Sequence, residues 1–184
     1  MILETERLIL RPMEWTDSSN LLEYHSNSAI VRYIPWTQRD SDGLQKYMER
    51  ILSESTSQLV NDKDYLILVW QLKETGKVVG QSNLGVKSKE NRTAEIGWVT
   101  HQDFQRQGFA FEASYELLRH AFQDLKLHRI VAEIDTRATT SAGLASKLGM
   151  RLEGEFKEVE FFKGFWCDMW RYAILESEFE KGIK

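Results

Sequence analysis

The sequence is poor in the features that mark secreted, membrane or disulfide-rich proteins. Cys167 is its only cysteine, so no disulfide framework can form and a reducing cytoplasm is the expected location. No apolar run approaches the roughly 20 residues that a membrane-spanning helix needs, so no membrane association is expected. The opening segment MILETERLIL carries acids and lacks both a basic start and a small-residue cleavage site, so no signal peptide is predicted.

An excess of positive charge is also missing. The formal net charge is -4, whereas nucleic-acid-binding domains usually concentrate basic residues, so a nucleic acid is not expected as a partner. Hydrophobic residues make up 42% and charged residues 28% of the chain, which is typical of globular proteins. A length of 184 residues fits one domain, 1–184, with a substantial core.

Apolar periodicity predicts an α/β domain with a mixed sheet. Seven strands are expected, at 5–13, 64–72, 78–86, 93–100, 128–135, 150–161 and 165–175. Helices are expected from Asp17 toward His25, over 40–54, after the loop that ends at Ala110, and over 140–148. The segment 64–72 is apolar on both strand faces, so it should lie centrally and be covered on both sides, at the start of an antiparallel meander that runs to residue 100.

One loop, between the strand at 93–100 and the following helix, suits an anion. It contains Gln105, Arg106, Gln107, Gly108, Phe109 and Ala110. A helix N-terminus offers free N–H groups and the positive end of the helix dipole. Gly108 permits close approach or a positive φ, Ala110 keeps bulk away, and Arg106 adds donors for phosphate. Because a P-loop ending and the further glycines of a dinucleotide fingerprint are absent, the loop predicts a diphosphate held without a metal. The alternative is an ordinary turn before a helix.

The pattern Gln105-x-x-Gly108-x-Ala110 resembles the Q/R-x-x-G-x-G/A motif of the GNAT family of N-acetyltransferases. The segments LETERLILRPM, AEIGWV, QGFAFEA, LHRIVAEID, SKLGMRLEGEF and YAIL together resemble the bacterial branch that acetylates ribosomal-protein N-termini, in order and over almost the whole chain. The resemblance implies a mixed, mostly antiparallel GNAT sheet flanked by helices, with acetyl-CoA as co-substrate. It places the pyrophosphate on the loop amides and the pantetheine arm in a gap between the strands 93–100 and 128–135. Backbone amides around Trp98 and Val99 would there polarise the thioester carbonyl.

The resemblance also suggests which side chains act in catalysis. Glu160 is the first candidate for the base that takes the amine proton, because similar enzymes place an acidic residue there, facing the acceptor; the alternative is a solvated strand glutamate. Glu95 is the second candidate, beside the expected pantetheine path; the alternative is a strand-face glutamate paired with a basic neighbour. Ser141 lies where the family pattern suggests a proton donor to the leaving sulfur and a cofactor contact; the alternative is the N-cap of the helix at 140–148.

The turn after the strand 128–135 departs from the family pattern D-P-x-N-x-x-S. The segment reads DTRATTS, with Thr136 in place of the proline and Ala138 in place of the asparagine, while Ser141 is kept. Losing the asparagine removes a side-chain hydrogen bond, usually worth about 0.5–1.5 kcal/mol net. We therefore expect either weaker cofactor binding or binding re-routed through Thr139 or Thr140.

Three functions follow from these residues. The first is transfer of an acetyl group from acetyl-CoA to the N-terminal α-amine of a protein. The second is transfer to a small amine such as a polyamine, an amino acid or an antibiotic. The third, motivated by Ala138, is an acyl-CoA-binding module without catalysis.

Other features narrow the choice of partners. The acids Glu153, Glu155, Glu158 and Glu160 either form a solvated face or suit a cationic acceptor. The four histidines show no ligand spacing, so no metal is expected. Exposed aromatic strands near the C-terminus permit a homodimer.

Overall fold

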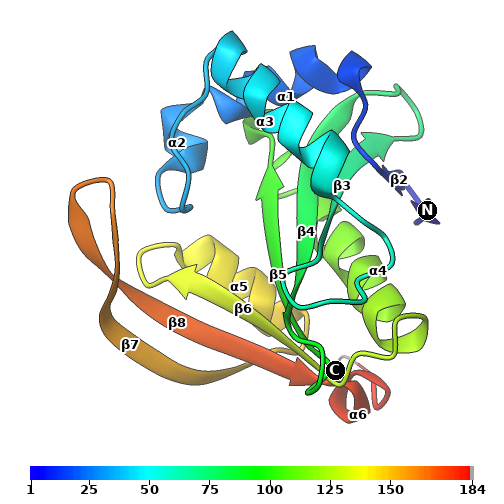
Figure 1. Cartoon of the computed structure of the whole chain (residues 1–184), viewed down its shortest axis with the longest axis vertical. Coiled ribbons are helices and arrows are strands. Elements are labelled where there is room, and N and C mark those ends of the chain that lie inside the picture. Colours follow the sequence, from blue (N-terminus) through cyan, green and yellow to red (C-terminus); the bar gives the residue numbers. More distant parts are fainter. Residues whose placement is uncertain (183–184) are drawn as a thin grey trace.

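Residues 1–182, which the computed structural model describes, form a single mixed sheet with helices on both of its faces (Figure 1). The strand order is β1-β2-β3-β4-β5-β6-β8-β7. The strands are β1 Leu3–Glu4, β2 Leu8–Arg11, β3 Tyr65–Leu72, β4 Val78–Ser88, β5 Thr93–Thr100, β6 Arg129–Asp135, β7 Arg151–Phe162 and β8 Phe165–Leu175. Every neighbouring pair is antiparallel except β5 and β6, which are parallel. The predicted α/β class with a mixed, mostly antiparallel sheet is confirmed.

The predicted number of seven strands is wrong, because the segment 5–13 does not form one continuous strand. Thr5 closes a turn: its N–H donates to the Leu8 carbonyl at 3.0 Å, and its Oγ1 accepts from the Leu8 N–H at 2.9 Å. This turn folds Leu3–Glu4 back onto β2 as a two-residue edge strand, which makes eight strands. The predicted alternation holds within β2 itself, where Leu8 and Leu10 are fully buried.

The four predicted helices lie close to their expected positions. The helices of the structure are α1 Ser18–His25, α2 Ser28–Val31, α3 Ser41–Glu54, α4 Phe109–Gln123, α5 Thr139–Lys147 and α6 Glu176–Phe179, with 3-10 turns at Trp15–Asp17 and Gln102–Phe104. The predicted four are α1, α3, α4 and α5, whereas the short helices α2 and α6 were not predicted. The start of α3 has a clear local cause, since Asp40 Oδ1 accepts a hydrogen bond from the Gly43 N–H at 2.8 Å and caps the helix. None of the helices within residues 1–182 combines the length and the apolar content that crossing a bilayer would demand.

Two hydrophobic cores lie on opposite faces of the sheet, and β3 contributes to both. Leu66, Leu68 and Trp70 belong to the core under α4 and α5, whereas Ile67 and Val69 belong to the core under α1 and α3. The doubly covered central strand is therefore confirmed. The core under α4 is close-packed because that helix presents small residues to the sheet, among them Ala113, Ser114 and Ala121, all fully buried.

The parallel pair β5 and β6 parts soon after it begins. Only Thr93, Ala94 and Glu95 are paired, with Arg129, Ile130 and Val131 respectively. Beyond these pairs β5 stays bonded to β4 as far as Thr100, and β6 stays bonded to β8 as far as Asp135. The two strands therefore diverge toward their carboxyl ends (Figure 1).

The sheet is tightly packed against Gly80 of β4, beside the point where β5 and β6 diverge. A Cβ at this position would lie 2.3 Å from Trp70 Cε3 and 2.6 Å from the Val99 carbonyl oxygen. The Trp70 ring is fully buried and held by a hydrogen bond from its Nε1 to Ser82 Oγ, so it has little room to shift. We expect Gly80→Ala to lower the free energy of unfolding by about 1–3 kcal/mol in chemical denaturation.

Gly85 on the same strand is the matched control for that substitution. A Cβ there would stand 3.8 Å from Tyr65 Cβ, which is an ordinary contact. Gly85→Ala should therefore change the stability much less than Gly80→Ala. Equal denaturation midpoints for the two variants would contradict the close approach described for Gly80.

Candidate active site

The divergence of β5 from β6 leaves backbone groups of β5 facing a gap. The His101 N–H, just after β5, donates to the Val79 carbonyl of β4 at 2.9 Å. Successive residues of a strand point their N–H groups to opposite edges. The Val99 N–H therefore points toward β4, while the Trp98 and Thr100 N–H groups point toward the gap. Of the two amides expected to polarise a carbonyl, the one at Trp98 has the suitable direction.

The loop between β5 and α4 presents a run of free amides. Arg106 and Gly108 have positive φ values of 61° and 87°, and alternating left-handed residues can turn successive N–H groups into an anion-binding concavity. Within residues 1–182, the N–H groups from Arg106 to Phe111 donate no hydrogen bond to another part of the chain. The first helical bond of α4 runs from the Glu112 N–H to the Gly108 carbonyl, at 3.0 Å. The positive φ that sequence suggested for Gly108 is confirmed.

The glutamine side chains of the loop fasten it from within. Gln105 Nε2 donates to the Thr100 carbonyl at 3.3 Å, and Gln107 Nε2 donates to the Asp103 carbonyl at 2.8 Å. These bonds hold the loop in shape and leave its backbone as the surface for a ligand. The exposed Arg106 guanidinium makes no ion pair within the described part of the chain, so it is available to an anion.

Arg7 and Glu112 brace the loop, and sequence reasoning missed both residues. Arg7 Nη1 donates to the Gln107 carbonyl at 3.1 Å, and its Nε donates to Glu112 Oε2 at 2.7 Å. The guanidinium also lies 4.2 Å from the centre of the Phe109 ring. Burial alone would raise the pKa of Glu112, but hydrogen bonds from Thr5 and Arg7 hold it below its ordinary value. The pair is separated by more than 100 residues, so no local pattern could reveal it.

His101 fixes the point where the chain leaves β5. Its buried ring accepts a hydrogen bond at Nδ1 from the Asp103 N–H, at 3.2 Å, and its Nε2 lies 2.8 Å from Glu23 Oε2. Lys77 binds the same Glu23 oxygen at 2.8 Å. A hydrogen bond from Lys77 and a weaker effect from the hydrogen bond of His101 lower the pKa of Glu23. This histidine therefore has a structural role, which ties the loop to α1.

Ser141 is not the N-cap of α5, so that alternative is wrong. The N-cap is Ala138, which has no side chain able to cap, and Ser141 is the third residue of the helix. The Ser141 N–H donates to the Ala138 carbonyl at 3.0 Å. Its hydroxyl makes no hydrogen bond to another residue in the part of the chain that the structure describes, which leaves it free for a ligand.

The turn between β6 and α5 is closed by Arg137, the residue just before Ala138, which stands in place of the family asparagine. Asp135 is almost fully buried, and it accepts hydrogen bonds from the Arg137 N–H at 2.9 Å and Nε at 2.8 Å. Burial raises the pKa of Asp135, but the Arg137 side-chain and backbone hydrogen bonds outweigh this and lower it. The turn thus keeps a defined shape although Ala138 cannot supply a side-chain bond.

Glu95 pairs with a basic neighbour, as its alternative interpretation predicted. Its Oε2 lies 2.8 Å from Lys87 Nζ, and this hydrogen bond raises the pKa of Lys87. Glu95 sits opposite Val131 at the last paired position before the two strands part. The Glu95 carboxylate is therefore occupied by the Lys87 ammonium group and is not free to meet an acceptor amine.

Glu160 lies on the inner face of the β7–β8 hairpin. It is directly opposite Cys167, so both side chains project to the same face, and Cys167 Sγ is 3.2 Å from Arg137 Nη2. The register is irregular between Phe156 and Glu160, and such bulges re-aim the side chains that follow them. Glu160 therefore lies on the side of the hairpin that contacts Arg137 in the turn after β6, the turn that leads into α5 and Ser141.

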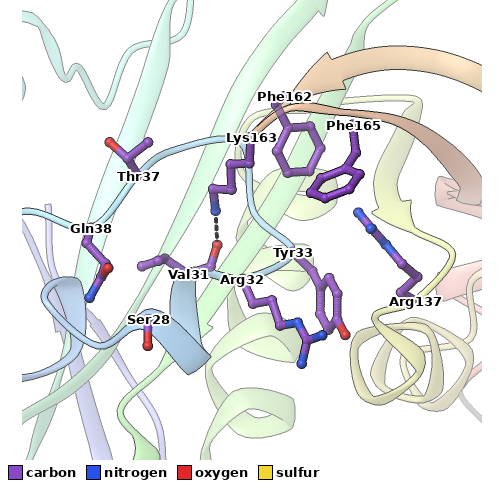
Figure 2. A pocket seen from close by; sticks show the side chains of 10 residues that line it. All are labelled: Ser28, Val31, Arg32, Tyr33, Thr37, Gln38, Arg137, Phe162, Lys163 and Phe165. Atoms are coloured by element: carbon purple, nitrogen blue, oxygen red, sulfur yellow. Dashed lines mark hydrogen bonds between the residues drawn. The ribbon is translucent and has the colours of Figure 1, made fainter.

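A cavity of about 420 Å³ opens beside this turn (Figure 2). Its walls come from α2 and the loop after it, from the β6–α5 turn, and from the tip of the β7–β8 hairpin. The lining residues are Ser28, Val31, Arg32, Tyr33, Thr37, Gln38, Arg137, Phe162, Lys163 and Phe165. Trp36 and Trp166 are not among them: Trp36 stacks on His25, and Trp166 packs on Phe161 at the exposed face of the hairpin.

No metal centre is visible in residues 1–182. No three His, Cys, Asp or Glu side chains come together there in an arrangement that could hold an ion. Cys167 is a buried free thiol, and Tyr172 belongs to the core under α5.

Comparison with known proteins agrees with this geometry. The family model described as "Acetyltransferase (GNAT) domain" matches residues 7–151. The uncharacterized N-acetyltransferase YnaD of Bacillus subtilis (strain 168) is 33% identical over 181 residues, which cover 97% of this chain and 99% of that protein. The ribosomal-protein-serine acetyltransferase of Escherichia coli (strain K12) is 34% identical over 89 residues, or 48% of this chain and 50% of that protein.

A solved structure shares the whole fold. The crystal structure of an acetyltransferase (GNAT family) from Bacillus anthracis superposes with a TM-score of 0.84 at 30% identity, covering 96% of this chain and 99% of that one. Together with the free amides before α4 and the gap between β5 and β6, these matches show that the chain belongs to the GNAT acetyltransferase family and is an acyl-CoA-dependent acetyltransferase.

Proposed function

We propose that this enzyme transfers the acetyl group of acetyl-CoA to the α-amine at a protein N-terminus, as in the ribosomal-protein branch that its sequence resembles. The observation that carries the proposal is the common position of the loop, the gap and the cavity. All three lie at the carboxyl ends of the parallel strands β5 and β6, where α/β sheets place their ligands. We further propose that residues 1–184 act as one domain, in the cytoplasm.

The choice of an α-amine rests on chemistry and on one relative. An α-amine has a pKa near 8 and is partly neutral at physiological pH, whereas a lysine side chain near 10.4 is not. Neither candidate base is buried here: Glu160 is exposed, and Glu95 is bound to Lys87. Such a site suits an acceptor that needs little help to lose its proton. The partial match to a ribosomal-protein-serine acetyltransferase supports the same class.

In this proposal the backbone does most of the cofactor binding. The amides from Arg106 to Phe111, which include those of Gly108, Phe109 and Ala110, would bind the pyrophosphate, and the Arg106 guanidinium would add a charged contact. Gln105 and Gln107 hold this loop in shape. The Trp98 amide would donate to the thioester oxygen, whereas Val99 supports the strand from the β4 side. These groups suit a diphosphate without any metal ion.

The side chains supply the proton transfers. As the amine nitrogen bonds to the acetyl carbon, Glu160 would accept the proton that the nitrogen loses. The Trp98 N–H would stabilise the negative charge on the carbonyl oxygen. As the carbon–sulfur bond breaks, Ser141 Oγ would donate a proton to the sulfur and regain one from water. Glu95 is the alternative base.

Gly108→Val should weaken CoA binding about tenfold or more, measured by calorimetry in the presence of a chelator. A β-branched residue resists a φ of 87°, and a Cβ at this position would come within 3.2 Å of Arg7 Nη2. Gly76→Val is the control, because Gly76 has a similar φ of 74° in the distant β3–β4 turn. If wild-type protein binds no CoA in chelator, or if both variants lose affinity equally, the loop is not the site.

Arg7→Met should weaken CoA binding about tenfold, because it leaves the negative charge of Glu112 without a cationic partner beside the expected pyrophosphate. The double variant Arg7→Met/Glu112→Gln should recover part of that loss, since no charge then repels the phosphates. Arg50→Met, which removes an exposed arginine of α3, is the control. If the double variant binds CoA no better than Arg7→Met does, the negative charge of Glu112 is not the cause of the lost CoA affinity.

Glu160→Gln should lower turnover by about 10²–10⁴-fold while leaving CoA affinity nearly unchanged, because it removes the proton acceptor and no cofactor contact. Raising the pH should restore part of the rate, since more of the amine is then already neutral. Turnover should be followed as release of the CoA thiol across a range of pH, with affinity measured separately by calorimetry.

Two further variants make this test specific. Ser141→Ala should also spare CoA affinity, but higher pH should not rescue it, because protonation of the leaving sulfur becomes harder. Normal turnover in Glu160→Gln together with an inactive Glu95→Gln would assign the base to β5 instead. Normal turnover in both would mean that water takes the amine proton.

A further inference from the structure

The cavity beside the β6–α5 turn is lined by positive charge. Arg32, Arg137 and Lys163 are among its lining residues, and no carboxylate is. The remaining walls are mostly aromatic or small, with Tyr33, Phe162 and others between the cations (Figure 2). This local charge is opposite in sign to that of the chain as a whole, whose net charge is -4.

Two of the cations are arranged around one aromatic ring. The guanidinium carbons of Arg32 and Arg137 lie 5.1 Å and 5.3 Å from the centre of the Tyr33 ring, and Figure 2 shows the ring lying between them. Within residues 1–182 Arg32 makes no ion pair, so its donors are free. Asp135 binds Nε and Nη2 of Arg137 and orients that side chain, which leaves its Nη1 without a partner among the same residues.

Lys163 is the third cation, at the tip of the hairpin. Its Nζ donates to the carbonyl oxygens of Val31 and Ile34, at the carboxyl end of α2 and just beyond it. Burial lowers the pKa of Lys163. Because its partners are carbonyl groups, its positive charge is not cancelled by a carboxylate. Lys163 therefore both draws the hairpin toward α2 and adds charge to the cavity wall.

Negative groups near the cavity are mostly bound to cations and do not line it. Asp135 binds Arg137, Asp168 lies near Arg137 but pairs with Lys157, and Glu160 is on the same hairpin face as Phe162. Within the described residues, only Glu160 of these three acids is not bound to a cation, and none of them lines the cavity. The rest of the acidic cluster seen in the sequence does not line the cavity: Glu153 pairs with Arg129 and Arg151, Glu155 pairs with Lys157, and Glu158 is exposed outside the cavity wall. The alternative of a cationic acceptor therefore finds no acidic surface at the cavity.

We infer that the enzyme selects an acceptor with a carboxylate close to its amine, namely a protein N-terminus with an acidic residue among its first few positions. This rests on the proposed transfer to an N-terminal α-amine. Guanidinium groups bind carboxylates with charge-assisted, often bidentate hydrogen bonds, and the free donors of Arg32 suit that contact. A polyamine would bring further positive charge toward three cations, and such repulsion is strongest where water is partly excluded.

The test compares peptides that share an N-terminal serine and differ only in the charge of the following residues. Peptides with Asp-Asp, Asn-Asn or Lys-Lys at positions two and three, together with spermidine, are assayed by thiol release from acetyl-CoA. We expect kcat/KM for the acidic peptide to exceed that for the neutral one by about tenfold, and the basic peptide and spermidine to be poorer still. Added salt should reduce this preference.

Variants then show whether Arg32 carries the preference. Arg32→Gln should shrink it several-fold, chiefly through KM for the acidic peptide, while the neutral peptide is little affected. Arg50→Gln removes an exposed arginine of α3 that does not line the cavity, so it should leave the preference intact. A preference that survives in Arg32→Gln unchanged would overturn the inference.

The outcomes separate this inference from the proposed function. If peptides are acetylated but the basic peptide or spermidine is the better acceptor, the charge selection is wrong and the transfer to amines stands. If free aspartate or glutamate is acetylated and no peptide is, the N-terminal acceptor is wrong and the charge selection stands. If CoA binds and none of these amines is acetylated, both are overturned.

Discussion

The early parting of β5 and β6 is the constraint on which the rest of the site depends. Each strand keeps a full partner on its other side, β4 for β5 and β8 for β6, so the sheet survives the loss of pairing between them. Because the two strands are parallel, the segments that follow them emerge at the same end of the sheet. One segment becomes the loop before α4, and the other becomes the turn before α5. Backbone amides of β5 and of the loop are thereby left to a ligand.

The charge around each binding region differs from the net charge of the whole chain. Arg7 neutralises Glu112 at the first turn of α4, so the positive end of the helix dipole is not cancelled at the loop. At the cavity, Asp135 orients Arg137 without removing the excess of positive charge. The acids that dominate the composition are engaged elsewhere, for example with Arg129, Arg151 and Lys157. A net charge of -4 therefore says little about what either binding region prefers.

Features with local causes were predictable from the sequence. A run that is apolar on both strand faces predicted the doubly covered strand β3, the helix expected over 40–54 matches α3, and Gly108 predicted a left-handed residue before α4. Features that depend on distant contacts were not predictable. The brace between Arg7 and Glu112 joins residues that are 105 positions apart in the sequence. The extra strand β1 follows from a local turn at Thr5, which the expectation of one continuous strand over 5–13 overlooked. The cations of the cavity come from three separate segments, so only the folded chain brings them together.

Amide hydrogen exchange with and without CoA, in the presence of a chelator, tests the central claim that free backbone amides hold the cofactor. The account predicts that CoA slows exchange at the amides from Arg106 to Phe111 and at Trp98. It predicts no change in the β3–β4 turn around Gly76, which lies outside the site. Protection confined to other segments while CoA is bound, with unchanged exchange from Arg106 to Phe111, would contradict it.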